Sequence, residues 1–232
     1  MSAISAWQSI RDGFDFSPLL DILMSVIPAL ICITLHELSH GLVAYRLGDP
    51  TAKNAGRLTL NPIKHLDPIG LLMLVTVHVG YAKPVPVNMY RFKNPKRGMA
   101  LTALAGPASN VVIAVVFLFL YGFFSPLLVR SSAGRYALDL LRLTGVISIG
   151  YAIFNMLPIP PLDGSKVLLS VLSDESYQRL MRYERYGSLL LLALVWTGLL
   201  GRPLTLAINA VARWLTPAAM AGLRLGQILF IH

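Results

Sequence analysis

Two histidines and a glutamate lie close together in a segment that otherwise carries almost no charge: His36, Glu37 and His40. Residues four apart share one face of a helix, so both imidazoles would point the same way. His-Glu-x-x-His is typical of zinc hydrolases, in which the histidines bind the metal and the glutamate accepts a proton from water. Ionisable side chains within an apolar helix are costly without a partner. A metal ion would be a partner for all three.

A catalytic zinc site needs a third protein ligand and an open fourth position. The apolar segments hold very few acids, and Asp163 is the strongest candidate. It follows a proline-rich stretch, starting at residue 155, that ends an apolar segment and must break its helix. Broken backbone at membrane depth is tolerated where it lines a cavity. The pair Asp163-Gly164 by itself would be an ordinary turn, but together with the histidines it is better explained as part of a metal site.

The composition sets the environment in which this site must lie. The chain has 232 residues, of which 55% are hydrophobic and 13% are charged, whereas soluble domains carry about 25% charge. We therefore expect an all-α polytopic membrane protein forming a single domain over residues 1–232. The only cysteine, Cys32, excludes an internal disulfide. The net charge of +9 comes from basic residues between apolar segments, which favours a role in membrane orientation and argues against nucleic-acid binding.

About five to six transmembrane helices are expected, since a span needs about 20 apolar residues. The candidate segments are 18–46, 99–129, 137–157, 187–205 and 206–231, and the last two form a predicted helical hairpin. The apolar run at 69–79 is short and favours a re-entrant element. Pro84 and Pro86 exclude a helix around them, and residues 80–93 are predicted to form a short membrane-associated β hairpin or edge strand. Basic residues in 46–97 and 166–186 place these segments on the cytoplasmic side.

The two motifs together resemble the site-2 protease family of intramembrane zinc metalloproteases. That family pairs the helical histidine motif with Asn-x-x-Pro-x-Pro-x-Leu-Asp-Gly, which is present here from Asn155 to Gly164. Residues 48–62, 81–88 and 105–110 also resemble the compact prokaryotic branch, which lacks PDZ and CBS domains. The resemblance covers about residues 25–170. It implies a catalytic core at 18–170, whereas the helical hairpin at 187–231 is expected from hydropathy alone.

The resemblance also implies roles for individual residues. His36, His40 and Asp163 would bind one Zn²⁺ ion, Glu37 would be the general base, and Asn155 would hold the water or the developing oxyanion. Asn155 could otherwise be a packing amide between helices. The substrate would be a transmembrane protein, cut in or near its membrane segment in the lipid bilayer.

An unwound substrate could pair with the expected edge strand by β-augmentation, and Val85, Val87 and Asn88 are the pairing positions. A plain surface loop is an equally good reading of that segment. His65 is either part of a turn with Asp67 or a second ligand or lid contact, and His78 is expected at the membrane interface. Gly106 and Asn110 are expected to pack beside the site.

Two alternatives come from other classes: a metal-binding membrane transporter, and an inactive relative that binds transmembrane helices. Transport would require further acids and histidines along the other spans, and segments 111–124 and 188–200 have none. An intact Glu37 argues against an inactive relative. The expected location is the prokaryotic plasma membrane, with the active site toward the cytoplasm. A monomer and a homodimer both remain open.

Overall fold

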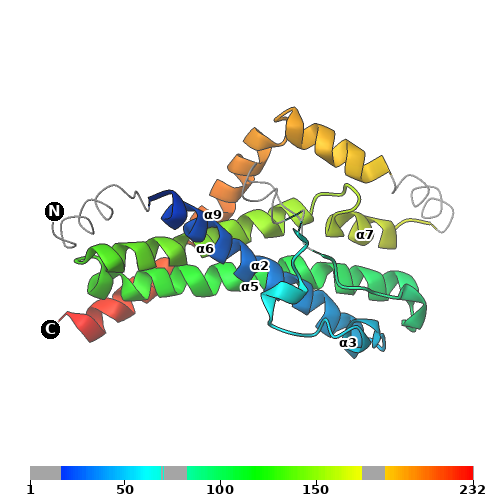
Figure 1. Cartoon of the computed structure of the whole chain (residues 1–232), viewed down its shortest axis with the longest axis horizontal. Coiled ribbons are helices and arrows are strands. Elements are labelled where there is room, and N and C mark those ends of the chain that lie inside the picture. The colour runs from blue at the N-terminus through cyan, green and yellow to red at the C-terminus, as the bar shows by residue number, and fades with distance from the viewer. Residues whose placement is uncertain (1–16, 69, 71–82, 174–185, 232) are drawn as a thin grey trace, which may run out of the picture.

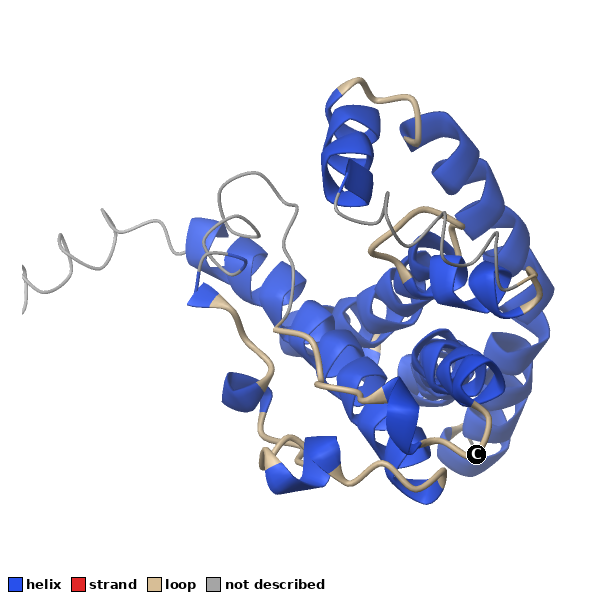
Figure 2. Cartoon of the chain, turned by 90° about the vertical axis from the view of Figure 1, so that its right-hand side faces the viewer, coloured by secondary structure: helices blue, strands red, loops and turns tan. Residues whose placement is uncertain are grey.

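The computed structural model describes residues 17–68, 70, 83–173 and 186–231. These residues are mostly helical, and none of them forms a strand (Figure 2). The expected all-α architecture is therefore confirmed for the described part of the chain. The apolar run at 69–79 lies outside it, except for Gly70.

Three long helices form the centre of the fold: α2 (Ser17–Arg46), α5 (Pro95–Leu128) and α6 (Ser132–Asn155). All three are long and apolar enough to cross a membrane. A short turn reverses the chain between α5 and α6, and the Ser131 hydroxyl caps α6 by accepting a hydrogen bond from the Gly134 N–H. The two helices lie side by side, and α2 crosses them (Figure 1). This crossing brings the middle of α2 against α5.

The C-terminal part differs from the expected hairpin of two spans. Helix Tyr186–Trp196 and α9 (Gly201–Phe230) meet at a bend of 86°. Gly198 adopts a positive φ of 70° between them, a conformation that commonly ends helices. The described part of the first arm, Tyr186–Trp196, is by itself too short to cross a bilayer, so the described residues of this pair add at most one span. The described residues thus contain three candidate spans, or four with the bent pair, rather than the five to six expected.

Short elements connect the long helices: α3 (Thr51–Asn54), η1 (Pro62–Lys64), η2 (Met89–Arg91) and α7 (Asp163–Ser170). The expected strand is not formed within residues 83–93. Residues 83–88 form neither helix nor strand, Asn88 is extended, and η2 follows them. Residues 80–82 lie outside the described chain. Two prolines in the segment remove ladder donors, which explains why an extended conformation does not become a strand here.

A small apolar core joins α5, α6 and α9 through Ala114, Leu118, Ile149 and Leu215. Large apolar side chains also lie on the outer surface, including Val112, Trp196 and Leu206. Such a surface suits hydrocarbon rather than water. The fold therefore has apolar side chains both inside and outside, and its buried polar residues include His36 and His40 on α2 and Asp163 on α7.

Candidate metal centre

His36, His40 and Asp163 converge on one point, although Asp163 is 127 positions from His36 in the chain. All three are buried, and their candidate ligand atoms lie within 4.8 Å of one another. The Asp163 Oδ2 atom is 3.1 Å from His36 Nε2 and 3.0 Å from His40 Nε2. Ligand atoms about 2.0–2.1 Å from one tetrahedral zinc ion lie about 3.3 Å apart, so the spacing is close to that of a zinc site.

The protonation of His40 shows that these residues fit a metal. Its Nδ1 atom is 2.7 Å from the backbone carbonyl of Thr102, which can only accept, so Nδ1 carries a proton. A neutral His40 then has a lone pair on Nε2, facing the carboxylate oxygen of Asp163. Two lone pairs repel, whereas a cation between them is bound by both. A second-shell carbonyl on the distal nitrogen is also the usual arrangement for a metal-binding histidine.

Two glycines make room for this convergence. A Cβ atom at Gly106 on α5 would lie 2.4 Å from His40 Nε2 and 2.5 Å from His36 Cε1. A Cβ atom at Gly164 would lie 2.2 Å from the carbonyl oxygen of Met156. Gly106 therefore lies beside the site, as the sequence indicated. Gly164 lets the start of α7 pass close to the end of α6, which brings Asp163 to the histidines.

The Asp163 carboxyl is ionised in this environment. Burial raises its pKa, but the hydrogen bonds and charges of His36 and His40 outweigh burial and hold the pKa below its usual value. Lys166, one turn further along α7, lies 3.7 Å from the other carboxylate oxygen. An anionic carboxylate is the form that binds a metal.

Glu37 contacts the segment of residues 83–88. Its Oε2 atom accepts a hydrogen bond of 2.8 Å from the Val85 N–H. The Val85 side chain is buried and lies against Gly41, one turn along α2 from Glu37. One carboxylate oxygen of Glu37 is therefore fixed by backbone, and the other remains for chemistry.

The side chains of two further candidates, Asn155 and His65, are hydrogen-bonded to backbone carbonyls. The Asn155 side-chain N–H donates to the Tyr151 carbonyl at 3.1 Å, one turn back in its own helix. His65 is fully buried and donates from Nε2 to the Thr59 carbonyl at 2.9 Å. Within the described residues, His36, His40 and Asp163 form the one group that could hold a metal, so a second-ligand role for His65 is not supported. His78 lies outside the described chain.

Two groups that hold the residues around the metal centre could not be identified from the sequence. They are the carbonyl of Thr102, which contacts His40, and the carboxylate of Asp49, which contacts Asn88. A backbone carbonyl leaves no signal in the residue type at its position. Asp49 follows Gly48 and precedes Pro50, which looks like an ordinary turn, yet its side chain is fully buried and ionisable. Only the tertiary contacts show that it belongs to this region.

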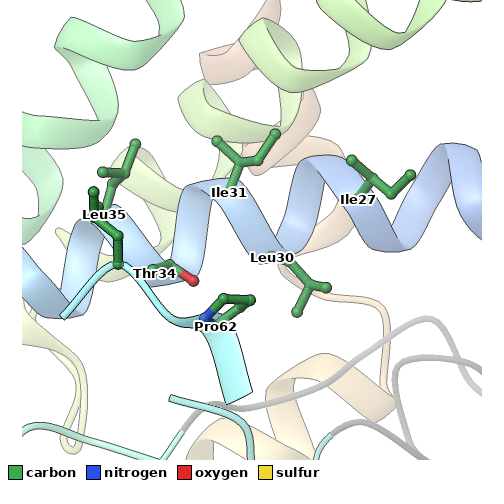
Figure 3. A pocket seen from close by; sticks show the side chains of 7 residues that line it. Ile27, Leu30, Ile31, Thr34, Leu35 and Pro62 are labelled. Carbon is green, nitrogen blue, oxygen red and sulfur yellow. The ribbon is translucent and has the colours of Figure 1, made fainter. Parts of the chain in front are cut away.

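An apolar hollow of about 370 Å³ lies along the same helix (Figure 3). Its lining comes from α2 and the loop before and within η1: Ile27, Leu30, Ile31, Thr34, Leu35, Leu60 and Pro62. The Thr34 hydroxyl is buried and has no hydrogen-bond partner in the described structure. The residues of α2 that line the hollow end at Leu35, directly before His36 in the sequence.

Two buried imidazoles and a buried carboxylate that could hold one metal ion, with a glutamate beside them in the sequence, are the side chains of one class of protein, the metal-dependent hydrolases. Comparisons with known proteins narrow this class. The sequence profile of peptidase family M50 matches residues 127–197. That match includes the segment from Asn155 to Asp163.

Two relatives extend the similarity over most of the chain. The "Putative zinc metalloprotease YwhC" of Bacillus subtilis (strain 168) is 37% identical over 199 residues, which cover 81% of this chain and 87% of that protein. The "Putative zinc metalloprotease Rip2" of Mycolicibacterium smegmatis is 33% identical over 178 residues, covering 75% of this chain and 66% of that protein. No solved structure matches the chain. The chain belongs to peptidase family M50, the site-2 protease family, and is a metalloprotease.

Proposed function

We propose that this protein is an intramembrane zinc metalloprotease that hydrolyses peptide bonds in or near the transmembrane segments of membrane proteins. The observation that carries the proposal is the meeting of His36 and His40, on the candidate span α2, with Asp163 at the start of α7. Glu37 lies beside His36 on α2. The names of the relatives support zinc as the metal. Regulated intramembrane proteolysis is the process in which such an activity would serve.

His36, His40 and Asp163 would hold the zinc ion through two imidazole nitrogens and one carboxylate oxygen. Zinc bound by three protein ligands supplies a Lewis acid and lowers the pKa of a coordinated water to about 7. The chain's own contribution begins with orientation. The Thr102 carbonyl fixes the ring of His40, and Gly106 keeps the space beside both rings free of side-chain atoms.

Glu37 is the proposed general base. The Val85 N–H occupies Oε2, so Oε1 is the atom that accepts the proton from the attacking water and later returns it to the leaving amine. Asn155 is the proposed stabiliser of the developing negative charge. One N–H of its amide donates within α6, and the second remains available to an oxyanion.

Residues 83–88 are the proposed docking segment for an unwound substrate. The Val85 N–H of this segment contacts Glu37, the proposed general base, which is where a scissile bond must come. The N–H groups of Val85 and Asn88 already donate to Glu37 and Asp49. The Val87 N–H has no partner in the described structure, so it is the group best suited to pair with a substrate carbonyl.

The basic residues of 46–97 and 166–186 support placing this site toward the cytoplasm, in a prokaryotic plasma membrane. The His36–His40 half of α2 is followed directly by the first of these segments. The proposed substrates are transmembrane proteins cut near their cytoplasmic ends. The enzyme would act as a monomer or a homodimer in the lipid bilayer.

The decisive experiment compares wild type with Glu37→Gln, using the purified protein in lipid nanodiscs and a tagged single-span substrate. We expect cleavage to fall by at least about a thousandfold, because the proton acceptor is lost, while zinc content stays at about one ion per chain. Asp139→Asn is the matched control, since it removes an exposed carboxylate paired with Arg142 on the far part of α6. Cleavage by Glu37→Gln at the wild-type rate would refute the proposal. Zinc-dependent metal flux without cleavage would support a transporter instead.

A further inference from the structure

Asp49 is a buried carboxylate that the proposed mechanism does not use. It lies just beyond α2, and its side chain is fully buried. Its backbone N–H donates to the Ala44 carbonyl at 2.9 Å, which ties it to the end of the helix that carries Glu37. A buried charge in such a place must be fully hydrogen-bonded to be tolerated.

The hydrogen bonds of Asp49 divide between two parts of the chain. Its Oδ1 atom accepts from the N–H of Thr51 at 3.0 Å and also from the Thr51 hydroxyl. Its Oδ2 atom accepts a 2.6 Å hydrogen bond from the Asn88 N–H. Arg91 lies 3.8 Å away and is half exposed. One oxygen thus holds the local turn, and the other holds the end of residues 83–88.

The other end of residues 83–88 is fixed by different groups. The Lys83 carbonyl accepts a 2.5 Å hydrogen bond from Arg57 Nη2, and the Lys83 N–H donates to the His65 carbonyl at 2.9 Å. Between the two fixed ends, Pro84 and Pro86 restrict the backbone. A displacement at Asn88 must therefore reach Val85, three residues away, whose N–H contacts Glu37.

We propose that Asp49 is a positioning residue for Glu37, acting through the Asn88 N–H and the Val85 N–H. These hydrogen bonds form a closed path. Asp49 is bonded to the end of α2 and to Asn88, and Val85 in the same segment as Asn88 is bonded back to α2 at Glu37. Releasing Asn88 would let Val85 move away from the carboxylate of Glu37. The inference rests on the proposed role of Glu37 as proton acceptor.

Asp49→Asn tests this path with little change in shape. An amide keeps one acceptor oxygen for Thr51 and turns its NH₂ group toward the Asn88 N–H, so two donors meet. We expect kcat for the tagged single-span substrate to fall about tenfold to a hundredfold, the range of a lost hydrogen bond to a charged group. Zinc content per folded molecule should stay near that of the wild type, whereas the unfolding temperature should fall because two buried donors face each other. Asp139→Asn is again the matched control.

A double-mutant cycle with Val85→Pro separates positioning from a merely structural role. Proline removes the N–H that contacts Glu37, and Val85→Ala is the control that keeps it. If Asp49 acts through Val85, the double variant loses no more kcat than Val85→Pro alone. Losses that multiply would overturn the proposal, as would wild-type kcat in Asp49→Asn or a change confined to KM.

Asn88→Pro keeps the test decisive if Asp49→Asn fails to fold or loses zinc. It leaves the Asp49 carboxylate in place and removes the N–H that it holds, with Asn88→Ala as the control. The same fall in kcat with normal zinc content supports the proposal, and an unchanged kcat overturns it. The Glu37→Gln measurement stays separate: an active Glu37→Gln refutes the proposed function, whereas an inactive Glu37→Gln with a fully active Asp49→Asn refutes only this inference.

Discussion

The metal centre and the contact between α5 and α9 are held together in opposite ways. At the metal centre, buried polar groups meet at hydrogen-bonding distances, as His40 does with Thr102 and Glu37 with Val85. Between α5 and α9, backbones approach at glycines: a Cβ atom at Gly222 would lie 2.1 Å from the Phe119 carbonyl oxygen, and one at Gly226 equally close to that of Phe123. The first region depends on chemical partners, and the second depends on shape. Substitutions in the two regions should therefore affect different properties.

The largest effect is expected from Asp163→Ala. Removing one of three ligands leaves two histidines, which cannot hold a structured zinc site. Zinc content should fall below detection, and cleavage should fall to background. Metal analysis of the purified protein checks this directly. Zinc retained by Asp163→Ala would contradict the assignment of Asp163 as a metal ligand.

Gly106→Ala should produce the next largest effect. The added methyl would come within 2.4–2.5 Å of both imidazoles, which must then move. Overpacking of this kind costs about 1–3 kcal/mol, so we expect zinc affinity to fall about tenfold to a hundredfold. Titration with a zinc chelator measures it. Ala105→Ser, a similar small change one residue away, is the control, and equal zinc affinity in both variants would contradict the prediction.

Gly222→Ala should act on stability instead. The methyl group pushes against the Phe119 backbone, and α9 must move away from α5. A loss of about 1–3 kcal/mol in unfolding free energy is expected, with normal zinc content per folded molecule. Thermal unfolding in detergent, together with metal analysis, checks both parts. Zinc loss at unchanged stability would show that the two regions are not separate.

The smallest effect is expected in the pH dependence of stability. It should depend on Asp49, which is ionisable, and not on the contact between α5 and α9, which is formed at glycines. Burial raises the pKa of Asp49, but hydrogen bonds from Thr51 and Asn88 and the charge of Arg91 outweigh it and hold the pKa below its usual value. A lowered folded pKa stabilises the protein above the unfolded pKa of about 3.9, and this contribution is lost as pH falls through the folded pKa. Below about pH 4 the wild type should lose stability more steeply than Asp49→Asn. Parallel curves from unfolding at stepped pH would contradict this expectation.

The metal centre could be read from the sequence because zinc chemistry demands particular residue types. His36, His40 and Asp163 were identified by type and spacing, and the structure brings them together. The Thr102 carbonyl and the Asp49 carboxylate could not be identified, because their roles depend on tertiary contacts. For residues 80–93 the sequence leaves an edge strand or hairpin and a plain surface loop as alternatives, and no strand forms within residues 83–93. The N–H groups of Val85 and Asn88 bond to side chains instead of a neighbouring strand.

The C-terminal part shows the limit of hydropathy. Apolar content predicts two spans between 187 and 231, but the chain bends by 86° and the described part of the first arm is only Tyr186–Trp196. Hydropathy counts side chains, whereas the bend depends on the backbone conformation at Gly198. The spacing of Gly222 and Gly226, four residues apart, is one that membrane helices use for close packing. That spacing was a readable signal of the contact with α5.

The partner of His40 is a main-chain oxygen, and this has a consequence for how the site can vary. No side-chain substitution at position 102 can delete that acceptor, so the proton on Nδ1 is secured by the path of α5 and not by the chemistry of Thr102. Position 102 can change its residue type without altering the tautomer, provided that the new side chain fits. Only a shift of the helix itself would release the ring.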